Sequence, residues 1–149
     1  MKQTLYHRIA SGAIVIHKDS VLLVRYPEQY LVAPGGGIEL NESLEDAAVR
    51  ECAEETGVII KPIRLIVSEL MTTSKYLMQK NWFICKYVSG TPSVTEESKI
   101  EGITEVGWFT AKALKNEKVF PSIFKTMSFS DMIEYEGSPI IPPLTKANF

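Results

Sequence analysis

The chain has 149 residues, of which 45% are hydrophobic and 23% charged, and its formal net charge is −2 at pH 7. These values exclude a disordered or fibrous chain, and the slightly negative charge argues against general nucleic-acid binding. The longest early apolar run, residues 9–16, is too short to span a bilayer. Two cysteines are too few for a disulfide framework and favour a reducing, cytoplasmic setting. We expect one domain over residues 1–149, with neither nucleic acid nor membrane as a partner.

Runs of β-branched and aromatic residues predict a series of strands. They lie at residues 9–16, 21–25, 31–33, 63–70, 77–88 and 105–109. The sequence Pro34-Gly35-Gly36-Gly37 is a strong breaker of regular structure after the third run.

The helices predicted from the sequence are fewer than the strands. A helix is expected over 43–56, because Ser43 can cap its N-terminus and Gly57 can end it. Two more are expected, one beginning near Thr110 and one over 121–133, and the tail from about residue 137 is expected to be extended. Strands and helices that do not strictly alternate predict an α/β fold, with a mixed sheet and helices on both of its faces.

The predicted helix 43–56 carries carboxylates beside its packing face. At 100° per residue, Ala48 and Cys52 form the packing stripe, and Glu51, Glu54 and Glu55 fall next to it. Each like-charge pair at a spacing of three or four costs about 0.2–0.5 kcal/mol.

The acidic residues around this helix exceed the cations that could balance them. Residues 39–55 contain seven acidic side chains and one basic side chain, Arg50. Hard divalent cations such as Mg²⁺ or Mn²⁺ are natural counterions for such oxygen ligands. The alternative is a solvated acidic helix with no ligand.

The glycines before the helix strengthen the metal interpretation. Gly35, Gly36 and Gly37 bring bare backbone to the start of the helix, where N–H groups suit phosphate and carbonyl oxygens can join a metal shell. Three glycines after a proline are by themselves only a turn, so their position ahead of the carboxylates gives them their interest.

These residues together resemble a complete Nudix box. Gly36 is followed after five residues by Glu42 and after seven more by Arg50-Glu51-Cys52-Ala53-Glu54-Glu55-Thr56-Gly57-Val58, so the box covers residues 36–58. The one departure is Cys52, where the family usually has a larger aliphatic residue. On this basis the chain is similar to the MutT-type Nudix hydrolases.

The resemblance implies an α/β/α sandwich with a central mixed sheet, in which the box forms a loop-helix-loop. It also implies hydrolysis of a nucleoside diphosphate linked to a moiety X, with a nucleoside triphosphate, a nucleotide sugar and a dinucleoside polyphosphate as open alternatives. In that reading Glu51, Glu54 and Glu55 bind Mg²⁺ (or Mn²⁺), and the carbonyl of Gly35 or Gly36 completes the shell.

The resemblance assigns further roles around the metal. Arg50 orients the cluster, and Glu42 and Gly57 support the box. Glu51 or Glu54 is the base for the attacking water, although some members use a carboxylate on a later loop. The candidates for that late carboxylate are Glu96, Glu97 and Glu101.

The substrate-binding candidates are basic and aromatic residues outside the box. Arg8, Arg25 and Lys80 could reach phosphates, although each could equally be a solvated charge. Tyr76 lies 18 residues past the box, where diadenosine polyphosphate hydrolases carry a tyrosine. The other aromatic residues that could stack on a base, or pack in the core, are Tyr26, Tyr30 and Trp82.

Two classes of function follow. The first is a Mg²⁺-dependent pyrophosphohydrolase acting on a small nucleotide. The second is a catalytically silent Nudix-fold module that binds a nucleotide for regulation, which retention of every box glutamate disfavours. A homodimer contact through the C-terminal phenylalanines Phe120, Phe124 and Phe129 is left open beside simple packing.

Overall fold

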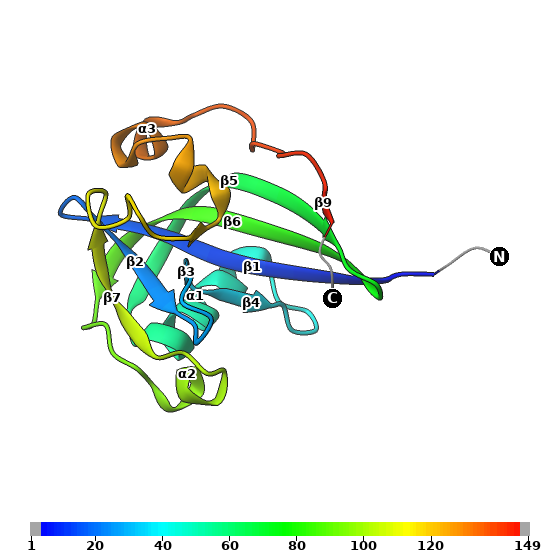
Figure 1. Cartoon of the computed structure of the whole chain (residues 1–149), viewed down its shortest axis with the longest axis horizontal. Coiled ribbons are helices and arrows are strands. Elements are labelled where there is room, and N and C mark those ends of the chain that lie inside the picture. Colours follow the sequence, from blue (N-terminus) through cyan, green and yellow to red (C-terminus); the bar gives the residue numbers. More distant parts are fainter. Residues whose placement is uncertain (1–3, 147–149) are drawn as a thin grey trace.

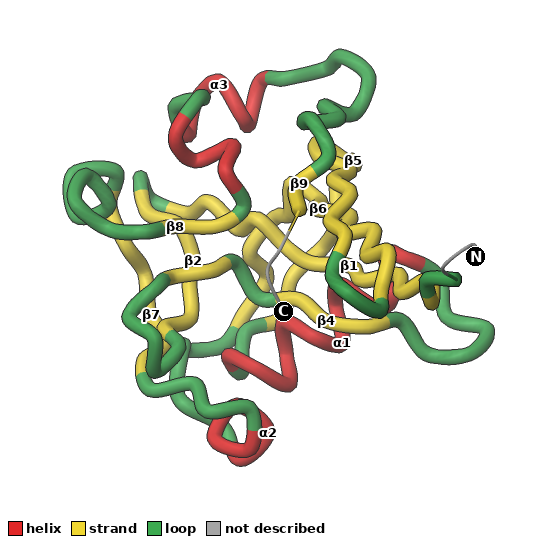
Figure 2. Tube along the Cα trace, turned by 45° about the vertical axis from the view of Figure 1, so that its right-hand side comes forward, coloured by secondary structure: helices red, strands yellow, loops and turns green. Residues whose placement is uncertain are grey.

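The computed structural model describes residues 4–146 and contains one nine-stranded mixed sheet with helices on both faces (Figures 1 and 2). The strands are β1 (Tyr6–His17), β2 (Ser20–Arg25), β3 (Leu31–Val32), β4 (Gly35–Gly37), β5 (Ile59–Thr72), β6 (Tyr76–Ser89), β7 (Glu105–Thr110), β8 (Val119–Phe120) and β9 (Thr145–Lys146). The helices are α1 (Leu44–Thr56), α2 (Glu96–Ile100), the 3₁₀ helix η1 (Ser122–Lys125) and α3 (Phe129–Glu134).

The sheet has two wings that share β1. One wing contains β4, β5, β6 and β9, and the other contains β2, β3, β7 and β8. The main strand order is β8-β3-β2-β1-β6-β5-β9, while β4 pairs with β1 and β7 pairs with β2. β1 runs parallel to β6 along most of its length but pairs with β2 only at its end, through Ile16 and His17. The wings therefore diverge from the β1–β2 turn. This arrangement confirms the α/β class with a central mixed sheet.

Alternating side chains of the strands build two cores, one on each face of the sheet. Ala13 and Val15 of β1 pack in a cluster with Ala48 and Cys52 of α1. The intervening Ile14 belongs to the other cluster, in which Ile123 and Met132 cover the sheet from η1 and α3 (Figure 1). The packing stripe expected for the helix is thus confirmed.

The predicted ends of α1 are also confirmed. The Ser43 hydroxyl accepts a hydrogen bond from the Asp46 amide at 3.0 Å, which satisfies one of the free N–H groups of the first turn. Gly57 ends the helix at φ 78°, in the left-handed region where a glycine carries no steric cost.

Three expectations about secondary structure were wrong. No helix begins near Thr110, since residues 111–116 form successive turns whose one buried side chain is Leu114. The expected helix over 121–133 is divided into η1 and α3, because Ser128 caps a new helix by accepting from the Asp131 amide. The glycine breaker 35–37 forms β4, which pairs with β1 from Ala10 to Gly12.

Gly12 of β1 is required by the packing of a tryptophan. A Cβ added at Gly12 would overlap the Trp82 indole and lie 2.8 Å from the carbonyl oxygen of Pro34. The opposite edge of the indole is fixed by Glu69, whose Oε1 accepts from Trp82 Nε1 at 3.0 Å. The indole is therefore held in place between β1 and β5.

Within residues 4–146, none of the helices combines the length and the apolar character needed to cross a membrane.

Replacing Gly12 by alanine should destabilise the protein by roughly 1–3 kcal/mol, the usual cost of overpacking a core. Gly37→Ala is the matched control, since a Cβ there meets nothing within 4 Å. We expect the control to change the unfolding free energy by less than about 0.5 kcal/mol in urea titrations. Equal stability of the two variants would contradict the placement of Trp82.

Candidate active site

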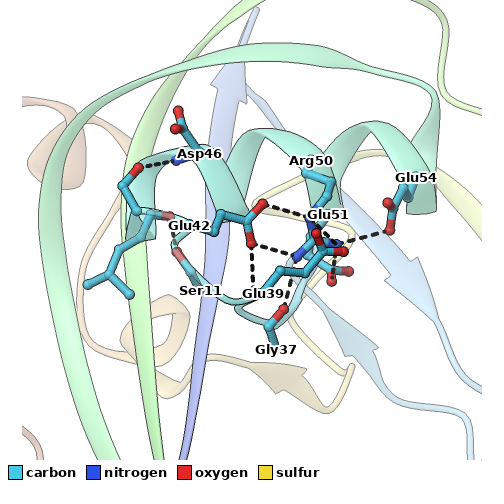
Figure 3. Close-up of polar contacts among 10 residues, drawn as sticks. Ser11, Gly37, Glu39, Glu42, Asp46, Arg50, Glu51 and Glu54 are labelled. Carbon is cyan, nitrogen blue, oxygen red and sulfur yellow. Dashed lines mark hydrogen bonds and ion pairs between the residues drawn. The ribbon is translucent and has the colours of Figure 1, made fainter.

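Arg50 ties α1 to the loop that precedes it (Figure 3). Its Nε and Nη2 donate to the two carboxylate oxygens of Glu42 at 2.8 and 2.9 Å, and Nη2 also donates to the Gly37 carbonyl at 3.0 Å. Its Nη1 donates to Glu51 at 2.9 Å and to Glu54 at 3.3 Å. The guanidinium lowers the pKa of Glu42 to about 2, because it bonds to the charged form.

Two carboxylates of α1 lie directly against the glycines of β4. Glu55 Oε1 accepts from the Gly35 amide at 2.7 Å. The Glu51 carboxylate lies so close to Gly36 that an added Cβ would be 2.6 Å from both of its oxygens. Both side chains are largely removed from solvent, with Glu51 7% and Glu55 1% exposed. The missing side chain of Gly36 leaves room for Glu51, whereas that of Gly35 leaves room for the backbone of β1, since an added Cβ would lie 2.7 Å from the Gly12 Cα.

A third carboxylate reaches the same place from α2. The Thr95 hydroxyl, which caps α2, donates to the Glu54 carbonyl and so anchors α2 to the end of α1. Glu101 at the C-terminal end of α2 then lies close enough to Glu55 to raise the pKa of that carboxyl group. Of the three late carboxylates considered above, the structure brings Glu101 to the box. Glu96 and Glu97 stay exposed on the first turn, where Glu96 pairs with Lys99 at 3.3 Å.

Burial disfavours the charged form of these acids. Desolvation, reinforced by the nearby charge of Glu101, raises the pKa of Glu55 to about 9. Desolvation also raises the pKa of Glu51, against the opposing effect of Arg50. A site of buried carboxylates that lacks enough positive charge suits a cation with hard oxygen ligands.

Arg50 supplies part of the positive charge that these carboxylates need. Its Nη1 contacts both Glu51 and Glu54. Across residues 4–146, no three acidic, histidine or cysteine side chains converge closely enough to enclose a metal ion. The oxygen ligands and their burial nevertheless fit a divalent cation.

The β4 glycines also line a cavity of about 1090 Å³ between the two wings of the sheet. Its wall is basic and aromatic, as expected for a site that receives an anionic ring-containing ligand. The basic residues are Arg8, Lys80 and Lys118, and the aromatic ones include Tyr26, Tyr30, Trp82 and Phe120. β4 therefore joins the carboxylate cluster to the cavity.

The structure separates the substrate-binding candidates. Arg8 and Lys80 line the cavity, and the Arg8 guanidinium lies 4.7 Å from the centre of the Tyr76 ring. Arg25 is not among the lining residues. Its guanidinium bonds to Glu105 at 2.7 Å and to Glu117 at 3.2 Å.

Sequence reasoning did not place Glu69, Lys118 or Phe120 in a substrate cavity. Glu69 lies on β5, whereas Phe120 lies on β8 and Lys118 just before it. No local pattern links them, since the pairing of distant strands brings them to one cavity.

Comparison with known proteins agrees with this site. The family model described as NUDIX domain matches residues 6–128. The chain belongs to the Nudix family. It is similar to the uncharacterized Nudix hydrolase YvcI of Bacillus subtilis (strain 168), with 27% identity over 78% of this chain and 74% of that protein. It is also similar to the NAD-capped RNA hydrolase NudC of Salmonella paratyphi C (strain RKS4594), with 30% identity over 67% of this chain and 40% of that protein.

The fold of the Nudix chain is similar to that of a solved family structure. The crystal structure of a NUDIX hydrolase from Nitrosomonas europaea has a TM-score of 0.70 at 21% identity, covering 99% of this chain and 82% of that one. Family membership supports a pyrophosphohydrolase that acts on small nucleotides, and Nudix hydrolases generally use divalent metal ions.

The raised pKa of Glu55 predicts how the metal-free protein responds to pH. Between the ordinary value of 4.5 and about 9, the folded state binds more protons than the unfolded state, so the unfolding free energy falls as pH rises. Glu51 acts in the same direction, whereas the contribution of Glu42 is complete above about pH 5. In EDTA we expect Tm to fall from about pH 6 to about pH 9.

Glu55→Gln is the test variant, since its amide oxygen can still accept from Gly35 without a buried charge. It should remove most of the fall in Tm, whereas Glu45→Gln, an exposed residue of α1, should not. A wild-type Tm that rises over this pH range would contradict the burial of Glu55 as an acid.

Proposed function

We propose that this chain is a Mg²⁺-dependent hydrolase that cleaves the pyrophosphate bond of a nucleoside diphosphate linked to a moiety X. The observation that carries the proposal is the contact of buried Glu51 and Glu55 with the β4 glycines, which also border the cavity. This contact gives a cation site and an anion-binding cavity a common wall. A substrate phosphate in the cavity would lie beside the carboxylates.

The residues that would hold the ion are Glu51, Glu54 and Glu55, with the carbonyl of Gly35 or Gly36. Carboxylate and carbonyl oxygens favour Mg²⁺ or Mn²⁺ over softer metals. When bound, such an ion neutralises the pyrophosphate and makes a water molecule more acidic at neutral pH.

The protein side chains have separate tasks in this proposal. Arg50 holds Glu51 and Glu54 in position through its Nη1. Glu51, Glu54 or Glu101 accepts the proton of the attacking water, and the contact between Glu101 and Glu55 supports Glu101 over the other late carboxylates.

The substrate would be bound in the cavity that the β4 glycines border, next to the carboxylates of α1. Arg8 and Lys80 supply positive charge inside the cavity. The Arg8 guanidinium packs over the ring of Tyr76 in a cation–π contact. Arg25, with two carboxylate partners and no place in the cavity wall, is not part of this proposal. A nucleoside triphosphate, a nucleotide sugar and a dinucleoside polyphosphate all satisfy this chemistry.

A screen of phosphate release identifies the substrate class. Nucleoside triphosphates, ADP-ribose, nucleotide sugars and dinucleoside polyphosphates would be incubated with the protein and alkaline phosphatase, with and without Mg²⁺. We expect at least one substrate whose hydrolysis depends on Mg²⁺. Folded protein that binds nucleotides and hydrolyses none of them would instead support a regulatory binding module.

Glu54→Gln and Glu55→Gln should each lower kcat by about a hundredfold or more, the range for a lost general base or charge-stabilising group. Both changes keep the size of the side chain and remove its charge. Glu45→Gln, on the exposed first turn of the same helix, should leave kcat within about twofold. Full activity of the two site variants at saturating Mg²⁺ would overturn the catalytic assignment.

A further inference from the structure

Four neighbouring strands, in the order β4, β1, β6 and β5, place residues in one row that leads from the β4 glycines across the cavity. Ala10 pairs with Gly37 on one side and with Lys80 on the other, and Lys80 pairs with Glu69. Neighbouring strands lie about 4.8 Å apart, so Glu69 is about 14 Å from Gly37 along this row. A nucleotide with its phosphates at β4 could therefore place its base near Glu69 and Lys80.

Glu69 and Lys80 are directly opposed on β5 and β6, yet they do not pair with each other. Glu69 Oε1 accepts from Trp82 Nε1, and among residues 4–146 its Oε2 has no protein partner. Lys80 likewise has no hydrogen-bond or ion-pair partner in the described part of the chain. Both side chains line the cavity, so an acceptor and a donor face it side by side.

A carboxylate is out of place in a cavity that is otherwise suited to phosphates. The cationic side chains of the cavity attract phosphates, whereas Glu69 repels them. Its free oxygen can accept from a ligand group that carries N–H or O–H donors. Ribose hydroxyls can also donate to a carboxylate, but only the edge of a base offers two neighbouring N–H donors next to an acceptor, which is the pattern that a carboxylate beside an ammonium group matches.

We propose that Glu69 and Lys80 recognise guanine, an inference that rests on the nucleotide substrate proposed above. The guanine edge presents the O6 acceptor next to the N1–H and N2–H₂ donors. Lys80 donates to O6, and the Glu69 carboxylate accepts from N1–H and N2–H₂. Adenine presents an amino donor where guanine has O6, so it would leave Lys80 without an acceptor.

The surroundings of this pair suit the flat faces of a purine. Met71 and Met78 form the next cross-strand pair on the same face of β5 and β6, two residues along, and also line the cavity. Thioether side chains pack well against aromatic rings. From the other wing, Phe120 lines the same cavity with 39% of its surface exposed, which leaves it available to the base.

Binding of GMP, IMP and AMP tests the proposal directly, because these monophosphates have no pyrophosphate bond to cleave. IMP differs from GMP only in lacking the 2-amino group. We expect calorimetry to give a Kd for GMP about tenfold or more below that for IMP, since a hydrogen bond to a charged group is lost. AMP should bind more weakly than GMP by at least the same factor.

Two substitutions separate the roles of the pair. Glu69→Gln keeps an oxygen for Trp82 but loses the charge, so it should weaken GMP about tenfold or more. IMP should be weakened by a smaller factor, because it makes only the N1–H bond to this carboxylate. Lys80→Met should weaken GMP and IMP together and spare AMP. The controls are Glu134→Gln on α3 and Lys86→Met on the exposed end of β6, both expected to bind as wild type.

Equal affinity for GMP and IMP, or binding of none of the three, would overturn the proposal. In the first case Mg²⁺-dependent hydrolysis of some nucleotide would leave the proposed activity standing, so the two failures can be told apart. A GMP preference in protein that hydrolyses no nucleotide would support guanine recognition and overturn the proposed activity.

Discussion

Glu51 of α1 can lie against β4 because Gly36 has no side chain. Glu51 occupies the volume that a Cβ at Gly36 would need, and Glu55 is held by the Gly35 amide. Both acids are buried there, which raises their pKa values and leaves the site short of positive charge. The proposed cation site, the proposed position of the substrate phosphates and the proposed role of Arg50 all rest on this one contact.

The divergence of the two wings explains why the contact opens onto a cavity. β1 pairs with β6 on one side and joins β2 only near its end, so the strands that carry Phe120 and Lys80 face each other across open space. Gly12 allows the Trp82 indole to lie between β1 and β5. One strand thus provides the floor of the cavity and the partner of β4.

Local signals predicted the parts of the fold that depend on local interactions. The ends of α1 were predictable because Ser43 and Gly57 satisfy or end the backbone hydrogen bonds of their own helix. The run after Thr110 looked helical, but with only Leu114 buried it has no apolar face to pack. β4 was missed since glycine disfavours strands, and pairing with β1 overrides that propensity.

The candidate site likewise contains residues that local sequence predicts and residues that only the tertiary fold brings together. The three carboxylates of α1 share one helix, so their grouping could be worked out from helical geometry alone. Glu101 could be named only as one of three late acids, because its position depends on the anchoring of α2 through Thr95. Glu69 gave no signal, since its significance comes from its pairing with Lys80 and its place in the cavity.

Mn²⁺ affinity of Gly36→Ala compared with Gly37→Ala is the most direct test of the central contact. The free ion would be measured by its electron paramagnetic resonance signal in titrations of each folded variant. Alanine at position 36 displaces the Glu51 carboxylate, so Kd should rise about tenfold or more, whereas alanine at position 37 meets nothing and should leave Kd unchanged. Wild-type affinity in Gly36→Ala would contradict the account.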